Sequence, residues 1–285
     1  MKRSLVTAVM IALAVFVMSN GLAVAKKAPP PFTYAFVDTD GDGVYTEGVD
    51  LPAVVNEHDA ADGSWIEITV PDSLVGSSAA ASGAASPALV FPAKTRLKNG
   101  DGALWISSPG TVHIGPGVQM RAGSSINISG AGLVVGAGAA FITSVSGDVT
   151  LDIGDGGVNL DSARFDTSHL TIYVGVDYGN GLNGALVAEN VTIETQTMTL
   201  GTREGISLTD STVHFKNSKA DGDPQAVLTT NFDYWGAEGS PYPVDLSRTT
   251  FAGPGKNYYS VDVYGSPVIK DGMKMKGTYD MYIAP

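Results

Sequence analysis

Apolar residues in this chain recur as pairs separated by a single residue, and this pattern constrains the fold more than any other feature. Each pair marks a short strand with one buried face, because side chains of a strand alternate between its two faces. Most successive pairs begin only 6 to 9 residues apart, and glycine often supplies the sharp corner between them. The pairs are Leu104/Ile106, Val112/Ile114, Val118/Met120, Ile126/Ile128, Leu133/Val135, Val149/Leu151, Val158/Leu160, Leu170/Ile172, Val191/Ile193, Met198/Leu200, Ile206/Leu208 and Val213/Phe215.

Three such strands give a coil of about 22 residues, which is within the range of repeats that stack into solenoids. A β-sandwich is the alternative, but its strands usually run longer, with turns every 8 to 12 residues. Very short strands bury little in a hairpin meander, whereas stacking them in parallel buries a continuous apolar column. The sequence therefore predicts an all-β fold, a single-stranded parallel β-helix (a β-solenoid) with a short β segment in front of it.

Residues 104–215 resemble a right-handed parallel β-helix of the pectate-lyase-like superfamily, and residues 110–138 are also similar to bactofilin-like and adhesin-head β-solenoids. The first resemblance implies a polysaccharide lyase, an enzyme that combines acidic calcium ligands with a basic residue on one outward face. The acidic candidates are Asp148, Asp152, Asp161, Asp166 and Asp210, and the basic candidates are Arg164, Arg203 and Lys216.

The chain begins with the features of a secretory signal peptide. Lys2 and Arg3 precede an apolar run over residues 5–18, and Ala23-Val24-Ala25 has the small residues of a cleavage site. The run is too short to span a bilayer. We expect cleavage after Ala25 and an exported bacterial protein, periplasmic, cell-surface or extracellular, with no membrane span in its mature form.

Four segments are predicted along the chain. After the signal peptide (1–25) come an N-terminal β segment (26–76), a linker or loop rich in Ser, Ala and Gly (77–87), and a β-helix domain with a C-terminal cap (88–285). Residues 221–242 are expected to form a loop that protrudes from the β-helix.

The charge balance excludes one class of partner. The chain has 17 Lys and Arg against 29 Asp and Glu, and loss of Lys2 and Arg3 leaves 15 against 29, a net charge of −14. Nucleic acid is an unsuitable partner for such a chain, because phosphate binding needs a basic face. There is no cysteine, which excludes disulfides, thiolate metal sites and a lipoprotein anchor.

An acidic loop near the N-terminus resembles the DxDxDG calcium loops of dockerins and EF-hands. Asp38, Asp40 and Asp42 alternate before Gly43, so their carboxylates can converge on one hard cation. Val44 offers its carbonyl, and Thr46 binds directly or through water. Position 12 is Val49 instead of Glu, so the sequence leaves Glu47 or Asp50 to supply the last carboxylate. The predicted cofactor is Ca²⁺, and the alternative is an acidic surface turn.

Aromatic residues gather late in the chain and include Tyr234 and Trp235. Exposed aromatic rings stack on sugar rings, so these two residues are candidates for glycan binding. The alternative is that the late aromatics cap the end of the solenoid.

The sequence predicts a calcium-stabilised structural or adhesive protein of the cell surface, a matrix or a filament. Its expected partners are calcium and either polysaccharide or further copies of itself. Two alternatives stay open because a fold does not decide function: a lyase or glycoside hydrolase, and a non-catalytic glycan-binding protein.

Overall fold

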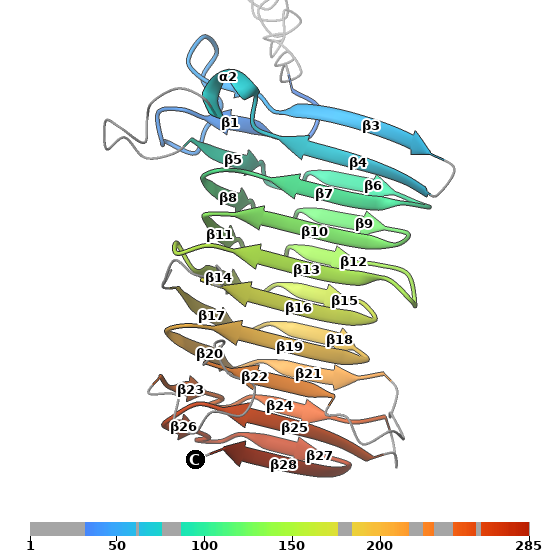
Figure 1. Cartoon of the computed structure of the whole chain (residues 1–285), viewed down its shortest axis with the longest axis vertical. Helices are drawn as coiled ribbons and strands as arrows, with labels where there is room; N and C mark the ends of the chain where they lie inside the picture. Colours follow the sequence, from blue (N-terminus) through green and yellow to red (C-terminus); the bar gives the residue numbers. More distant parts are fainter. Residues whose placement is uncertain are drawn as a thin grey trace, which may run out of the picture. The chain divides into compact units, whose positions relative to one another are not determined.

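A computed structural model describes residues 32–60, 63–75, 87–175, 184–216, 225–230, 242–254 and 258–284. Residues Phe32–Pro285 form one compact unit. This unit is nearly all β, and its one helix in the described part is a single turn, α2 (Asp72–Val75). The predicted parallel β-helix is confirmed (Figure 1).

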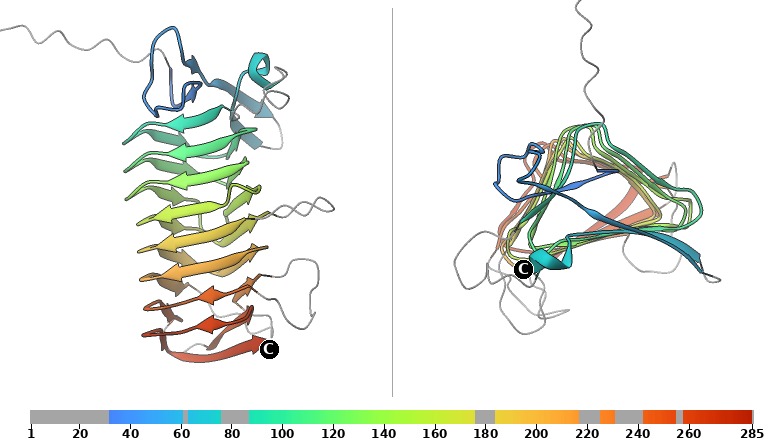
Figure 2. Two further views of the ribbon diagram at one scale, coloured as in Figure 1. Left: turned by 90° about the vertical axis from the view of Figure 1, so that its left-hand side faces the viewer. Right: turned by 90° about the horizontal axis from the view of Figure 1, so that it is seen from above.

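Eight coils of three strands each stack along the axis of this unit, and corresponding strands pair in parallel. The three sheets form the sides of a triangle when seen along the axis (Figure 2). Sheet A contains β5 (Ala88–Phe91), β8 (Thr111–Ile114), β11 (Gly132–Val135), β14 (Val158–Asp161), β17 (Ala185–Glu189), β20 (Gly205–Thr209), β23 (Val244–Asp245) and β26 (Val268–Ile269). Sheet B contains β6 (Arg96–Asn99), β9 (Gln119–Ala122), β12 (Ala140–Ile142), β15 (Arg164–Asp166), β18 (Thr192–Thr195), β21 (Thr212–Phe215), β24 (Thr250–Ala252) and β27 (Lys274–Lys276). Sheet C contains β7 (Ala103–Ser107), β10 (Ser125–Gly130), β13 (Asp148–Ile153), β16 (His169–Val174), β19 (Thr197–Thr202), β22 (Ala226–Thr229), β25 (Tyr258–Tyr264) and β28 (Thr278–Ala284).

The N-terminal segment extends two of these sheets and leaves the third short. In sheet A, β1 (Phe36–Asp38) pairs antiparallel with β5, and β2 (Leu51–Pro52) pairs with β1. In sheet C, β4 (Gly63–Thr69) pairs parallel with β7, and β3 (Val54–Ala60) pairs antiparallel with β4. Sheet B ends at β6. The N-terminal end of the stack is therefore stepped, with sheet B two strands shorter than its neighbours.

The apolar pairs of the sequence stack into continuous columns inside the triangle. In sheet C, Leu104 pairs with Ile126, Ile126 with Val149 and Val149 with Leu170, offsets of 22, 23 and 21 residues. All these side chains are buried. The coil of about 22 residues expected from the sequence is thus present. In sheet B the column includes Phe141 and Phe165, whose rings stack with their centroids 4.9 Å apart.

One corner of the coil has the same unusual backbone in every repeat. The residue between sheets A and B has a positive φ, from 50° to 75°, in all eight coils: Lys94, Gly117, Gly138, Ser162, Asn190, Asp210, Arg248 and Gly272. In the first seven coils its N–H donates to a carbonyl of the next coil, as from Lys94 to Pro116 (2.9 Å) and from Asn190 to Thr209 (3.1 Å). The hydrogen bonds along this corner hold even residues with a Cβ in a conformation they seldom adopt.

One expectation about the segments of the chain needs correction, and others concern residues outside the described part. The predicted loop over 221–242 is wrong at residues 226–229, because β22 is a strand of sheet C and buries Ala226 and Leu228. Residues 221–224 and 231–241 lie outside the described residues. Its three apolar residues are consecutive and flanked by polar Gln225 and Thr229, so strand β22 lacks the alternation that marks the others. The signal peptide (1–25) and residues 77–86 of the linker lie outside the described residues.

Truncation of a stacked core ring tests this architecture. Phe165→Ala is expected to lower the free energy of unfolding by about 3–5 kcal/mol. Loss of the ring leaves a cavity in the core, and the neighbouring coils are hydrogen-bonded into the stack and cannot move in to fill it. Chemical denaturation measures the change. Thr192→Ala, an exposed position of the same sheet, should change it by less than about 0.5 kcal/mol. A change in the free energy of unfolding as small for Phe165→Ala as for Thr192→Ala would contradict a tightly packed core column.

Candidate metal centre and ligand-binding surfaces

Four aspartates converge on the acidic loop that follows β1. Oxygen atoms of Asp38, Asp40, Asp42 and Asp50 all lie within 4.8 Å of one another. Asp38 is the last residue of β1, and Asp50 returns to it from the far end of the loop. Four carboxylates at this spacing could hold a metal ion, since hard cations bind several oxygen ligands at once.

Backbone donors position the two buried carboxylates of this group, Asp38 and Asp50. Asp38 accepts hydrogen bonds from Gly41 N (2.6 Å) and Gly43 N (2.8 Å), one on each oxygen. Asp50 accepts hydrogen bonds from Thr39 N (2.9 Å) and Thr46 N (2.7 Å). These bonds offset the cost of burying each carboxylate and leave lone pairs free for a cation.

The two exposed carboxylates, Asp40 and Asp42, repel each other across the open side of the loop. The pKa of Asp40 is raised: the hydrogen bond from Asp42 N lowers it, but desolvation and the negative charges of Asp42 and Asp50 outweigh that bond. The chain has no Lys or Arg between Lys27 and Lys94 to balance this charge. A bound cation would relieve the repulsion.

These four aspartates are the members of the seven-residue predicted metal site whose side chains come together in the structure. The sequence left Glu47 or Asp50 as the closing carboxylate; Asp50 joins the group of four, whereas Glu47 is exposed outside it. The Val44 carbonyl accepts a long hydrogen bond from the Thr46 hydroxyl (3.5 Å). Tyr45 packs edge-on against Phe36 of β1, with centroids 5.6 Å apart, and thereby ties the loop to sheet A.

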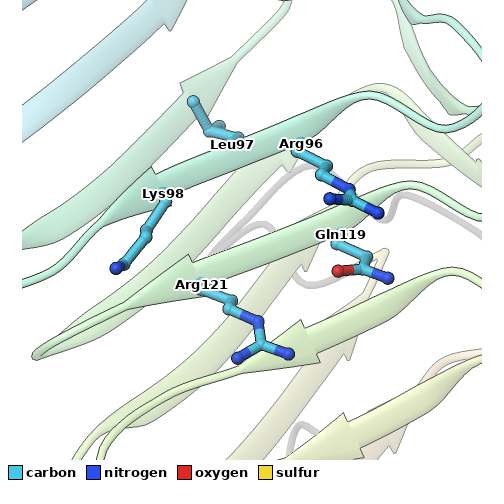
Figure 3. Close-up of a pocket in the computed structure, with 5 residues that line it drawn as sticks. All are labelled: Arg96, Leu97, Lys98, Gln119 and Arg121. Atoms are coloured by element: carbon cyan, nitrogen blue, oxygen red, sulfur yellow. The ribbon is translucent and has the colours of Figure 1, made fainter.

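A second feature is basic and lies on the outward face of sheet B. Its eight strands contain six of the chain's 17 Lys and Arg but two of its 29 Asp and Glu. Three of these cations gather at its N-terminal edge around a hollow of about 340 Å³ (Figure 3). We call this the basic patch; it is formed by Arg96, Lys98, Gln119 and Arg121.

The basic patch places like charges side by side. Lys98 on β6 is in register with Arg121 on β9, and Arg96 is in register with Gln119. Like charges at paired positions of neighbouring strands are destabilising. Within the described part of the chain, none of the three cations has an ion pair. The patch could therefore accept an anion.

Farther along sheet B, four charged side chains form a balanced network. Arg164 contacts Asp166 and Glu194, each at 3.3 Å, and Lys216 contacts Asp166 at 2.5 Å. Asp166, Arg164 and Lys216 were candidates from the lyase resemblance, and the fold does bring them together. Two cations and two carboxylates leave the network near neutral.

A third feature lies on the outward face of sheet C at the same end. Trp65 on β4 and Trp105 on β7 border a hollow of about 430 Å³, with Glu67 between them and small residues beneath. Trp105 is 53% exposed. His58 of β3 stacks on Trp65, with centroids 4.5 Å apart. We call this feature the tryptophan groove.

The remaining candidates from the sequence do not join these sites in the described residues. Tyr234 and Trp235 lie outside the described part of the chain. Asp148 and Asp152 lie on β13, and Asp161 is the last residue of β14. Asp210 lies in the corner after β20, where Arg248 holds it through two hydrogen bonds of 2.6 Å. Sequence reasoning missed the basic patch and the tryptophan groove, because each assembles residues about one coil or more apart.

No protein-family model, curated protein or solved structure matches this chain. Among the described residues, no helix has the length and apolar character needed to cross a membrane.

Removal of one exposed charge tests the repulsion in the metal-free loop. The folded state binds the Asp40 proton more tightly than the unfolded chain, whose pKa is near 3.8. Ionisation of Asp40 therefore lowers stability as the pH rises through the raised pKa, and this loss persists at pH 7. Asp40→Asn should raise the Tm at pH 7 in chelator and have no effect at about pH 3, where both states are protonated.

Thermal melts at the two pH values measure this difference. Asp155→Asn, in an exposed turn outside the cluster, is the control for loss of one negative charge. A lower Tm for Asp40→Asn at pH 7 in chelator would contradict the repulsion.

Proposed function

We propose that this chain is an exported adhesive β-solenoid that binds an acidic polysaccharide through the basic patch, with calcium clamping its N-terminal loop. The observation that carries the proposal is the unpaired cluster of Arg96, Lys98 and Arg121 on a protein with a net charge of −12. An acidic chain gains nothing in solubility from three adjacent cations. Such a cluster is suited to a polymer that carries carboxylates or sulfates.

The scaffold supports adhesion because it is rigid and repetitive. Neighbouring strands of a sheet are about 4.8 Å apart, so outward side chains form evenly spaced rows. Lys98 and Arg121 are successive members of one such row. A polymer can contact successive coils without ordering any loop, which limits the entropic cost of binding.

Calcium is the proposed metal because the donors are all oxygens and the loop is partly open. Asp38 and Asp50 hold fixed positions, while Asp40 and Asp42 are exposed and adjustable. Calcium accepts six to eight oxygen ligands in flexible geometry, whereas magnesium demands a smaller octahedral site. The ion would fasten the loop between β1 and β2 at the end of sheet A.

Thermal melts with and without calcium test the clamp. Free calcium at about 100 times its Kd should stabilise the protein by about 2.7 kcal/mol, or about 5–10 °C in Tm. Asp40→Asn combined with Asp42→Asn should abolish this shift. The matched control combines Asp155→Asn with Asp161→Asn and should keep it. No shift at millimolar calcium would remove calcium from the proposal.

Binding to polygalacturonate, with neutral dextran as reference, tests the basic patch. Lys98→Gln combined with Arg121→Gln should weaken binding about tenfold at low salt, since exposed ion pairs contribute up to about 1 kcal/mol each. Lys274→Gln combined with Lys276→Gln removes the same charge at the far end of sheet B and should leave affinity nearly unchanged. Added salt should weaken the wild type more than the patch variant.

Equal losses in both double variants would mean that net charge, not the patch, governs binding. Equally tight binding to double-stranded DNA would contradict a polysaccharide ligand.

A polysaccharide lyase is the second candidate, favoured by the convergence of Arg164, Asp166 and Lys216 on one outward face. The charge balance of this network argues for a structural role, because each candidate base is already paired. Formation of unsaturated products from polygalacturonate with calcium, lost in Asp166→Asn, would favour the lyase over the adhesive protein.

A further inference from the structure

We infer that the tryptophan groove is a binding subsite for a neutral hexopyranose, separate from the basic patch. The groove contains two of the chain's three tryptophans, brought together from positions 40 residues apart by the pairing of β4 with β7. Its hollow of about 430 Å³ is within the range of small-ligand pockets.

The repeat itself shows that the scaffold does not need these indoles. Trp105 follows Glu67 in an outward row of sheet C, and the next four coils place Asn127, Thr150, Thr171 and Thr199 at the paired positions. Ala103 is paired with Trp65, and in the following coils Ser125 is paired with Asp148 and Asp148 with His169. No tryptophan occupies these positions of the later coils. The two indoles therefore depart from the pattern, and Trp105 exposes about half of its surface to water.

The small residues beneath the indoles make the space for a ring. Ala103 is directly paired with Trp65, and Gly63, Ser64 and Ser124 complete the lining. A sugar ring with equatorial hydroxyls presents a continuous C–H face, which can lie flat on an exposed indole. Aromatic side chains with one wet face are suited to this stacking.

Glu67 gives the groove its polarity and its preference for uncharged sugars. It is paired in register with Trp105, and its carboxylate is about 41% exposed. His58 Nε2 approaches it at 3.5 Å, and Asn56 Nδ2 donates a 3.4 Å hydrogen bond to it. A carboxylate held in this way accepts hydrogen bonds from sugar hydroxyls and repels the carboxylates of uronic acids.

Titration of the purified protein with cellohexaose, followed by tryptophan fluorescence, tests the subsite. The expected result is a saturable change in emission. Trp105→Ala should weaken binding about tenfold, since stacking on an aromatic ring contributes up to about one order of magnitude. Trp105→Phe should keep part of the affinity, and an unchanged Tm in both variants would show that they fold.

Two further binding experiments test the class of the ligand and the location of its site. Hexagalacturonate should bind the groove more weakly than cellohexaose, and Glu67→Gln should narrow that difference. Lys98→Gln combined with Arg121→Gln should leave cellohexaose binding unchanged, which separates this inference from the proposed function.

Three results would overturn the inference. The first is no response to cellohexaose, laminarihexaose or mannohexaose at millimolar concentration. The second is tighter binding of hexagalacturonate than of these neutral probes by the variant that combines Lys98→Gln with Arg121→Gln, in which two cations of the basic patch are removed. The third is a response that survives Trp105→Ala but is lost in Trp235→Ala, which would move the sugar to the late aromatic cluster.

Discussion

The parallel hydrogen-bond ladder between coils, with its left-handed corner, is the constraint on which the rest of the structure depends. Each corner residue from Lys94 to Arg248 bonds into the stack at the same place, so the register of one coil sets the next. Inward residues then form buried columns, and outward residues form rows spaced by one strand. Outward side chains at paired positions of successive coils have similar surroundings. A side chain that differs in type from the others in its row therefore marks a position whose residue the scaffold does not determine.

The sequence predicted the solenoid because sheets A and C each contribute two inward residues per strand, as in Ile126 and Ile128. It predicted sheet B less well, because several of its strands bury a single side chain, such as Leu97 on β6 and Phe141 on β12. The four carboxylates of the acidic loop are close in sequence, so their convergence was predictable. The basic patch was not, because Lys98 and Arg121 are neighbours only once the register is known.

Charge is distributed unevenly over this acidic chain, and the fold produces the distribution. The N-terminal loop collects carboxylates in a stretch without Lys or Arg, while sheet B collects cations on its outward face. Each cluster stores repulsion that a ligand of opposite charge would relieve. The balanced network of Arg164, Asp166, Glu194 and Lys216 is the contrasting case, in which the protein neutralises its own charges.

Three departures from the repeat lie together at the N-terminal end of the solenoid. The acidic loop closes sheet A, the tryptophan groove spans β4 and β7 of sheet C, and the basic patch occupies the β6 edge of sheet B. This is the end where β1–β4 replace regular coils and leave sheet B two strands shorter. Real proteins break local rules of sequence and structure mainly where function requires it. On the proposed function, the N-terminal end would hold the ligands, and the regular coils beyond it would act as a rigid support.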